Sequence, residues 1–325
     1  MSRHGTPLRY PGGKQRLAPF IAEILEVNGL IGCHYIEPYA GGAGVAIELL
    51  LDDKVSHIHL NDISTPVYAF WHSVKHEHKE LCRRISRASI DLEEWKRQRE
   101  MLKRGKEISL IDLGFALFFM NRCNRSGILS GGLIGGLKQS GAWKMDARFY
   151  RNELIRRIEA IAEKSRSISL RNWDAEKFML QYLPRLPQNS LVYCDPPYFT
   201  KADTLYQNHY TPSDHLRISQ IIQENISLPW VVSYDTNPKI MSYYKRCEMF
   251  VYSIQYNVSR AYTGTEVFAF SEKLAIPSSS SLRFINQALE LREFVSESRA
   301  QQKIPACLAP LPSKGSRETV GIRGS

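Results

Sequence analysis

The sequence SLVYC at residues 190–194 runs directly into DPPY at residues 195–198. The first five residues are mostly apolar and favour a β-strand, and a proline cannot continue a central strand because it has no amide hydrogen to donate. The strand is therefore predicted to end near Asp195. In an open α/β sheet, ligands bind beyond the carboxyl ends of the strands, so Asp195 is expected to lie in a ligand site.

The DPPY residues suit a flat substrate that donates hydrogen bonds. The Asp195 carboxylate and the Pro196 carbonyl are two acceptors for the two hydrogens of an amino group, and Tyr198 offers a face for stacking. Such acceptors would hold the nitrogen lone pair out of ring conjugation and stabilise the positive charge that grows during methyl transfer. The other interpretation is a plain strand followed by a Pro-Pro turn with a capping Asp.

Composition sets outer bounds on fold and partners. The chain has 325 residues, a formal net charge of +10 and a sequence pI near 9.3. This length allows one large domain or two moderate ones, and the charge favours a polyanionic partner. The six cysteines form no CxxC pair and no His-Cys group at zinc-ligand spacing, which predicts free thiols in a reducing compartment and no metal site.

No membrane segment is expected. The most apolar stretch, residues 110–120, contains Asp112 and is too short to span a bilayer. The N-terminus lacks the apolar core of a signal peptide. We therefore expect a cytoplasmic protein.

The spacing of apolar residues predicts an α/β fold. Short β-favouring runs predict strands, at residues 34–36, 55–60, 167–170, 190–194 and 230–234. Longer amphipathic runs predict helices, at residues 19–25, 44–51, 154–164 and 213–226. Residues 249–255 and 265–270 would form a hairpin that closes the sheet. His57 and His59 alternate along one strand and are interpreted as its polar face, not as metal ligands.

These elements divide the chain into three parts. Residues 1–75 and 150–275 are predicted to form the catalytic domain. Residues 76–149 are predicted to be an insertion that is helical to about residue 120 and then a basic loop rich in Gly, Asn and Ser. Residues 276–325 would be a tail, with a helix followed by disorder.

Three motifs upstream of DPPY add to the expected site. EPYAGGAG at residues 37–44 puts glycines on a strand-to-helix turn, where a backbone without side chains lets a ligand approach closely. Asp62 ends the next strand, where it could accept from ribose hydroxyls or cap the following helix. RYPGGK at residues 9–14 offers an aromatic ring, an amine and a flexible turn, without the spacing of a phosphate-binding loop.

Together these motifs resemble the Dam-type DNA adenine-N6 methyltransferases, the alpha group of amino-methyltransferases. RYPGGK, EPYAGGAG, LND at residues 60–62 and DPPY occur in the family's order, within residues 7–271. The resemblance implies a Rossmann-like methyltransferase sheet with helices on both faces and an inserted helical and loop target-recognition domain. It also implies S-adenosylmethionine as methyl donor, a flipped adenine in double-stranded DNA as substrate, and neither a metal nor a covalent enzyme intermediate.

The resemblance also assigns roles to residues. Expected cofactor contacts are Tyr10, Lys14, Glu37, Pro38, Tyr39, Gly41, Gly42, Gly44, Asp62, Asp174 and Asp195. Ala175 follows Asp174 where the family usually has Phe. Expected catalytic residues are Asp195, Pro196, Pro197 and Tyr198. Expected DNA contacts are Arg9, Asn121, Arg122, Asn124, Arg125, Lys138 and Lys144. Arg260 or Tyr262 would help Tyr198 to support the flipped base.

Alternatives stay open at this level. Cytosine-N4 methylation uses the same geometry, although that group more often has Ser at the position of Asp195. A non-catalytic DNA-binding protein with a retained methyltransferase fold is the second alternative, and the intact Asp195, Tyr198, Lys14 and Asp62 argue against it. Methylation of RNA or of a protein amide is less favoured. A companion restriction or defence system would fit the predicted activity, and no oligomeric state is predicted.

Overall fold

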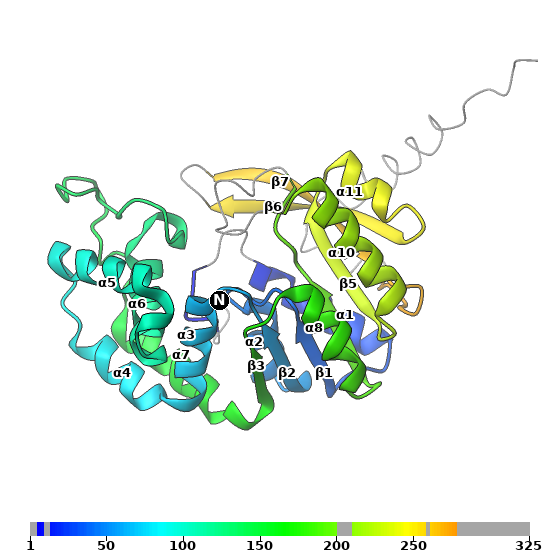
Figure 1. The fold of residues 1–325 in the computed structure, drawn as a ribbon, viewed down its shortest axis with the longest axis horizontal. Helices are drawn as coiled ribbons and strands as arrows, with labels where there is room; N and C mark the ends of the chain where they lie inside the picture. The colour runs from blue at the N-terminus through cyan, green and yellow to red at the C-terminus, as the bar shows by residue number, and fades with distance from the viewer. Residues whose placement is uncertain (1–4, 10–13, 200–209, 258–260, 278–325) are drawn as a thin grey trace, which may run out of the picture.

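A seven-stranded sheet in the order β3-β2-β1-β4-β5-β7-β6 organises the molecule (Figure 1). The computed structural model describes residues 5–9, 14–199, 210–257 and 261–277. The strands are β1 (Cys33–Glu37), β2 (Val55–Asn61), β3 (Ile168–Arg171), β4 (Ser190–Cys194), β5 (Trp230–Asp235), β6 (Glu248–Asn257) and β7 (Ala261–Phe270). The strands predicted from sequence are confirmed, with small changes at their ends.

The pairing of the strands brings their carboxyl ends to one edge. β1 pairs in parallel with β2 and β4, β2 with β3, and β4 with β5. β7 is antiparallel to both β5 and β6. The predicted hairpin is confirmed, but its second strand lies inside the sheet, between β5 and β6, instead of extending the edge in chain order. Residues that end β1, β2 and β4 therefore share one side of the sheet, where α/β proteins bind ligands.

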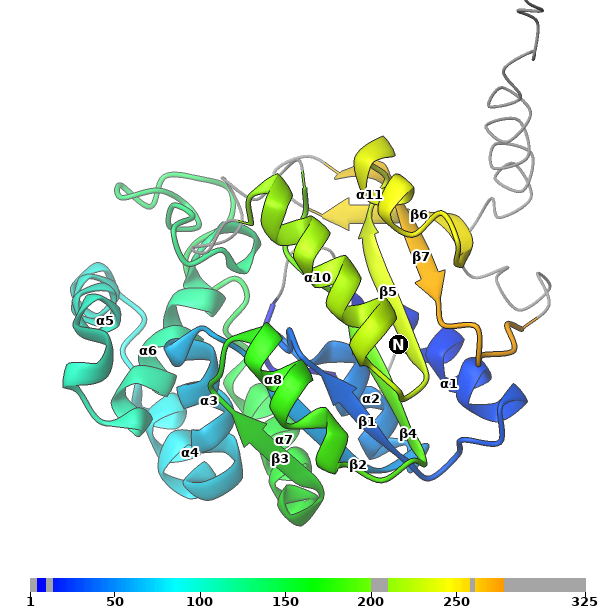
Figure 2. The same cartoon turned by 45° about the vertical axis from the view of Figure 1, so that its right-hand side comes forward.

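Helices cover both faces of the sheet, as predicted (Figure 2). One face packs on α1 (Ala18–Val27), α2 (Gly44–Leu51), α3 (Thr65–His76) and α7 (Arg151–Glu163). The other packs on α8 (Ala175–Gln181), α10 (Pro212–Asn225) and α11 (Pro238–Tyr243). Short 3₁₀ helices are η1 (Lys14–Leu17), η2 (Gly105–Glu107), η3 (Arg125–Gly127), η4 (Ser165–Ser167) and η5 (Leu183–Arg185).

Three further helices, α4 (His78–Arg87), α5 (Leu92–Arg104) and α6 (Leu110–Cys123), follow α3 and lie beside the sheet (Figure 1). Two begin at side-chain caps: Asp91 accepts from the Glu94 amide at 2.8 Å, and Ser109 accepts from the Asp112 amide at 3.2 Å. Nearly all of α6 is buried, which explains why its sequence is apolar on every side. The prediction that the chain from residue 76 is helical to about residue 120 is confirmed.

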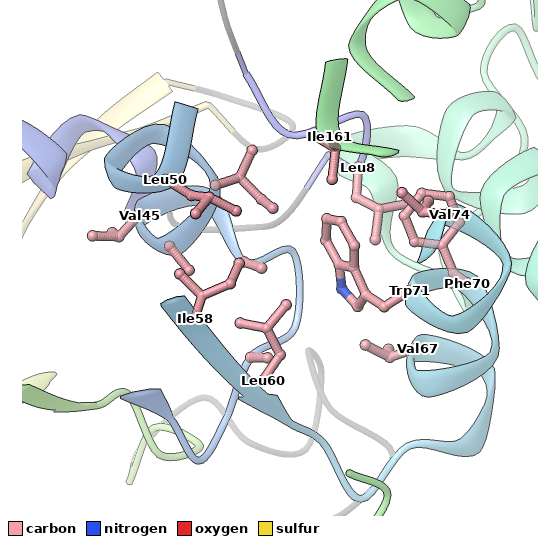
Figure 3. Close-up of a cluster of buried hydrophobic side chains, with 14 of the residues drawn as sticks. Leu8, Val45, Leu50, Ile58, Leu60, Val67, Phe70, Trp71, Val74 and Ile161 are labelled. Carbon is pink, nitrogen blue, oxygen red and sulfur yellow. The ribbon is translucent and has the colours of Figure 1, made fainter. Parts of the chain in front are cut away.

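The core beneath the site joins β2, α2, α3 and the N-terminal segment. Figure 3 shows Trp71 of α3 pointing toward the side of β2 that carries Ile58 and Leu60. Leu8 from the N-terminal segment is buried in the same cluster. The indole nitrogen of Trp71 donates to the Gly41 carbonyl at 2.9 Å, so the core directly fixes the glycine turn of EPYAGGAG.

The strand histidines form an internal stack. The rings of His34, His57 and His59 stack on each other, and His59 is 4 % exposed. His59 Nε2 lies 2.9 Å from His34 Nδ1, and its Nδ1 lies 3.0 Å from the Tyr182 hydroxyl. Burial lowers the pKa of His59 to about 3, so this ring is neutral. The polar face is thus a hydrogen-bonded group of rings in which His59 is buried and His34 and His57 are partly buried.

Among the described residues, no three His, Cys, Asp or Glu side chains are grouped so that they could hold a metal ion. None of the described helices has the length and apolar character needed to cross a bilayer.

Candidate active site

A cavity of about 470 Å³ opens beyond the carboxyl ends of β1, β2 and β4. Its walls come from all four sequence motifs and from the residue at the start of α8. The predicted site residues that line it are Lys14, Glu37, Pro38, Tyr39, Gly41, Gly42, Gly44, Asp62, Asp174, Asp195, Pro197 and Asn121. Tyr10 lies outside the described residues. The fold therefore gathers segments that are far apart in the chain around one concave site of ligand size.

Asp195 and Lys14 meet at the wall of this cavity. The Lys14 ammonium is 3.0 Å from Asp195 Oδ1. The side chains of Lys14 and Asp195 are 12 % and 21 % exposed, so this ion pair is largely screened from solvent. Burial disfavours the ammonium, but the nearby carboxylates outweigh burial and raise the pKa of Lys14. Lys14 is therefore charged.

A serine on the neighbouring strand completes the surroundings of Asp195. Ser233 of β5 donates to Asp195 Oδ1 at 2.9 Å and accepts from Lys14 at 3.1 Å. The Tyr193 hydroxyl lies 2.8 Å from the same serine oxygen. Burial raises the pKa of Asp195, while Lys14 and Ser233 act in the opposite direction because both donate to the carboxylate. These donors hold one oxygen of Asp195 in a fixed direction at the cavity wall.

Two more carboxyl groups line the cavity at the ends of β1 and β2. Glu37 is 4 % exposed, and burial raises its pKa to about 8. Burial likewise raises the pKa of Asp62 to about 6. Asp62 accepts from the amides of Gly41 and Ser64, both at 2.8 Å. Asp62 thus ties the glycine turn to Ser64, the residue just before α3.

The glycine turn is shaped partly by η1, which carries Lys14. Ala43 adopts a left-handed conformation with φ of 45° just before α2 begins. A Cβ on Gly44 would lie 3.0 Å from Gln15 Cβ and 3.3 Å from Gln15 Cα. Gly44 therefore lets η1 approach α2 closely, in addition to lining the cavity. This contact was not expected from the sequence, which assigned the missing side chain to the ligand alone.

The rest of DPPY lies deeper than the sequence suggested. Pro197 lines the cavity, whereas Pro196 is buried and Tyr198 is 3 % exposed, and neither is among the residues of the cavity wall. The Tyr198 hydroxyl donates to Glu266 at 2.6 Å, and the Lys14 ammonium lies 5.4 Å from the centre of its ring. The Phe199 amide donates to Asp235 at 3.0 Å. In this structure Tyr198 therefore packs behind the cavity, whereas the sequence predicts that its ring faces a substrate.

Asp174 both caps α8 and lines the cavity. Its carboxylate caps α8 by accepting from the amides of Glu176 at 2.9 Å and Lys177 at 3.3 Å. Asp174 and Ala175 also line the cavity. The smaller Ala175 thus stands at the cavity wall where the resembled family usually has a Phe.

The match to a family model agrees with this arrangement. Residues 10–271 match the model of the D12 class of N6 adenine-specific DNA methyltransferases. The chain belongs to this family. No curated protein matches it. The protein is thus a DNA methyltransferase that acts on N6 of adenine, and the cytosine-N4 and non-catalytic alternatives are not favoured.

In this D12 methyltransferase, the side chain of Asn121 holds the N-terminal segment in place, and that of Asn124 holds the loop that follows α6. Asn121 accepts from the Arg9 amide at 2.8 Å and donates to the Arg9 carbonyl at 2.6 Å. Asn124 is fully buried and accepts from the Trp95 indole at 2.8 Å. Its amide nitrogen donates to the carbonyls of Ile128 and Leu129. These amides are committed to internal hydrogen bonds, so their placement argues against the predicted direct contact of Asn121 and Asn124 with bases.

The basic residues of the insertion divide by exposure. Arg125, Lys138 and Lys144 are exposed, which leaves them accessible to DNA phosphates. Arg122 is 8 % exposed, and burial lowers its pKa to about 9. Arg9 is half-buried and donates to the Asn124 carbonyl at 3.0 Å. Arg260 and the side chain of Tyr262 lie outside the described residues.

Sequence reasoning missed several residues of the D12 methyltransferase site. Tyr193, Tyr210, Gln15 and residues 128–130 line the cavity. Ser233 and Glu266 support the Lys14–Asp195 pair from behind. The one available signal was Glu266, a lone acid inside the strand-like run at residues 265–270. A charge in such a run is rarely buried without a purpose.

Proposed function

We propose that the cavity binds S-adenosylmethionine together with a flipped adenine of double-stranded DNA, and that Asp195 receives the adenine N6 amine. The observation that supports this most strongly is the fixed carboxylate of Asp195 at the cavity wall. Lys14 and Ser233 hold this carboxylate by one oxygen, at 3.0 and 2.9 Å. An acceptor that is already oriented can stabilise developing positive charge without reorganising.

The charge of the cavity fits a cationic methyl donor. Of the charged residues that line it within the described part of the chain, Glu37, Asp62, Asp174 and Asp195 are acidic and only Lys14 is basic. S-adenosylmethionine carries a sulfonium and an ammonium group, and acidic surroundings favour both. By this proposal Glu37 and the glycine turn hold the methionine end, Asp62 holds the ribose, and Asp174 with Ala175 holds the adenine ring of the cofactor.

The proposed reaction is a direct displacement. The bound sulfonium supplies the methyl group, and its sulfur departs as a neutral thioether with the electron pair of the broken C–S bond. Asp195 and the Pro196 carbonyl accept the two hydrogens of the N6 amine, which leaves its lone pair free to form the new N–C bond. The amine becomes positively charged and then loses one proton. Asp195, as a hydrogen-bonded carboxylate, stabilises this charge and offers the first acceptor for the proton.

The partial burial of Asp195 supports base flipping. Its side chain is 21 % exposed, and it lines the cavity together with Tyr193 and the insertion residues 128–130. A nitrogen within a stacked duplex cannot reach such a position, so the target base must leave the stack. The exposed Arg125, Lys138 and Lys144 are proposed to hold the DNA backbone during this step.

Transfer of label from S-adenosylmethionine tests the proposal. The protein is incubated with methyl-labelled S-adenosylmethionine and mixed-sequence duplex DNA, and the methylated bases are identified after digestion. We expect label on N6 of adenine, at one short sequence. Label that appears only on single-stranded DNA, or no binding of S-adenosylmethionine, would refute the duplex or the cofactor part respectively.

The raised pKa values of Glu37 and Asp62 predict that cofactor affinity depends on pH. These groups ionise near pH 8 and pH 6, and only their charged forms attract a cation. Affinity for S-adenosylmethionine should therefore rise by about tenfold from pH 6 to pH 8. Titration calorimetry at several pH values measures it. The amino group of the cofactor also titrates in this range, so the protein's share is the difference between wild type and Glu37→Gln. Parallel pH profiles for these two proteins would contradict the role of Glu37.

A further inference from the structure

A fully buried carboxylate lies behind the site. Glu266 is in the middle of β7 and is 0 % exposed. Its backbone pairs with Asp235 of β5 on one side and Tyr252 of β6 on the other. Removing a carboxylate from water is costly unless it is paired and hydrogen-bonded, so a buried charge in a central strand needs strong partners.

Glu266 has such partners, and they belong to the site. Its Oε2 lies 2.6 Å from the Lys14 ammonium. The Tyr198 hydroxyl donates to Oε1 at 2.6 Å, and the Tyr252 hydroxyl donates to Oε2. Burial opposes ionisation, but Lys14 and the two tyrosines outweigh it and lower the pKa of Glu266. Glu266 is therefore ionised.

Glu266 acts on the cavity through Lys14, because it is not itself among the residues of the cavity wall. Lys14 stands between two carboxylates, 2.6 Å from Glu266 and 3.0 Å from Asp195. With Asp195 ionised, one positive and two negative charges leave this cluster with a net charge of −1. Without Glu266, Lys14 would neutralise Asp195 and the cluster would carry no net charge.

We propose that Glu266 is a positioning residue of the methyl-transfer site, which holds Lys14 and Tyr198 and supplies the negative charge by which the cavity prefers a sulfonium to a neutral thioether. The inference rests on the proposed use of S-adenosylmethionine. That donor and its product, S-adenosylhomocysteine, differ by one methyl group and one positive charge at sulfur. A buried unit charge near that sulfur favours the charged ligand by about tenfold at the effective dielectric of a protein site.

A four-protein charge cycle tests this. Dissociation constants for S-adenosylmethionine and S-adenosylhomocysteine are measured by calorimetry at pH 7.5 on wild type, Glu266→Gln, Lys14→Gln and the double variant. With Glu266 and Asp195 ionised wherever they are present, the cluster carries −1, 0, −2 and −1 charges in that order. We expect the preference for the sulfonium ligand to be greatest in Lys14→Gln and similar in wild type and the double variant. It should be about tenfold lower in Glu266→Gln than in wild type.

The four proteins also keep the test valid if the Glu266→Gln variant does not fold. Glu266→Gln leaves a buried ammonium with one carboxylate fewer, whereas the double variant replaces that ion pair by two amides and leaves Asp195, still hydrogen-bonded by Ser233, as the one charge of the cluster. If Glu266→Gln does not fold, the comparison of Lys14→Gln with the double variant still isolates Glu266. The matched control is Glu100→Gln, which removes a carboxylate that is 65 % exposed and pairs with Lys103 on the surface of α5. Its ligand preference should equal that of wild type.

Two results would distinguish a failure of the cofactor proposal from a failure of the role proposed for Glu266. Wild type that binds neither ligand would refute the proposed cofactor. Wild type that binds both, with a preference unchanged by every substitution of Glu266, would refute the role of Glu266 while the cofactor proposal stands. Glu266→Asp adds a test of position: it keeps the charge, so the ligand preference should stay, but the shorter side chain should release Lys14 and lower the rate of methyl transfer.

Discussion

Replacing Asp195 with alanine should lower the rate of methyl transfer by on the order of 10³-fold while the protein still folds. The carboxylate is the acceptor proposed to orient the N6 amine and to stabilise its positive charge. Its loss leaves the Lys14 ammonium paired with Glu266 at 2.6 Å, so no buried charge is left without a counterion. A single-turnover assay with labelled donor measures the rate, and thermal unfolding with calorimetry checks fold and cofactor binding.

The control for this prediction is Asp53→Asn. Asp53 is 77 % exposed and pairs with Lys164 on the surface, where an ion pair contributes little to stability. Its positive φ of 52° is one that asparagine also tolerates. The control should transfer methyl groups at the wild-type rate. Near-normal transfer by Asp195→Ala would refute the role given to that carboxylate.

Replacing Gly127 with alanine should lower the free energy of unfolding by about 2–4 kcal/mol. Gly127 has a φ of +76°, and a Cβ there would lie 2.4 Å from the Arg9 carbonyl oxygen and 2.8 Å from Arg9 Cβ. The backbone of Arg9 cannot move aside as the end of a flexible side chain can. The substitution should therefore push apart the insertion and the N-terminal segment that Asn121 joins, and activity should fall because Lys14 follows in that segment.

Gly136→Ala separates the two causes. Gly136 lies in the same insertion with a φ of +71°, but a Cβ there meets nothing within 4 Å. It should cost only the left-handed strain, about 1 kcal/mol. Urea unfolding of both variants gives the comparison. Equal losses for Gly127→Ala and Gly136→Ala would show that contact with Arg9 is unimportant.

Local pattern was enough to predict most of the sheet and the order of the motifs. Each of the parallel strands is a short run of β-favouring residues, and DPPY ends β4 because proline cannot extend it. The sequence also named Lys14 and Asp195, but it gave no sign that they form an ion pair. That contact depends on how η1 packs against α2, which is a property of the tertiary structure.

The pairing of polar side chains with partners elsewhere in the fold is what the sequence did not predict. Asn121 and Asn124 stand in a stretch of Gly, Asn and Ser, which reads as a solvated loop. Their amides are buried because they satisfy backbone groups of Arg9 and of the loop itself. Tyr198 was expected to face a substrate, yet its hydroxyl turns to Glu266 on β7. The spacing of apolar residues along the chain predicts which side chains are buried. It does not predict which buried polar groups form hydrogen bonds with one another.

The ion pair between Lys14 and Glu266 joins residues 252 positions apart. During synthesis, Lys14 and Asp195 both emerge from the ribosome before β7 exists, so a growing chain can bring these two together before Glu266 is available. The third charge arrives when the strand between β5 and β6 is in place. Contacts of such long sequence separation form slowly. A nascent methyltransferase would therefore acquire its full electrostatic preference at a late step of folding.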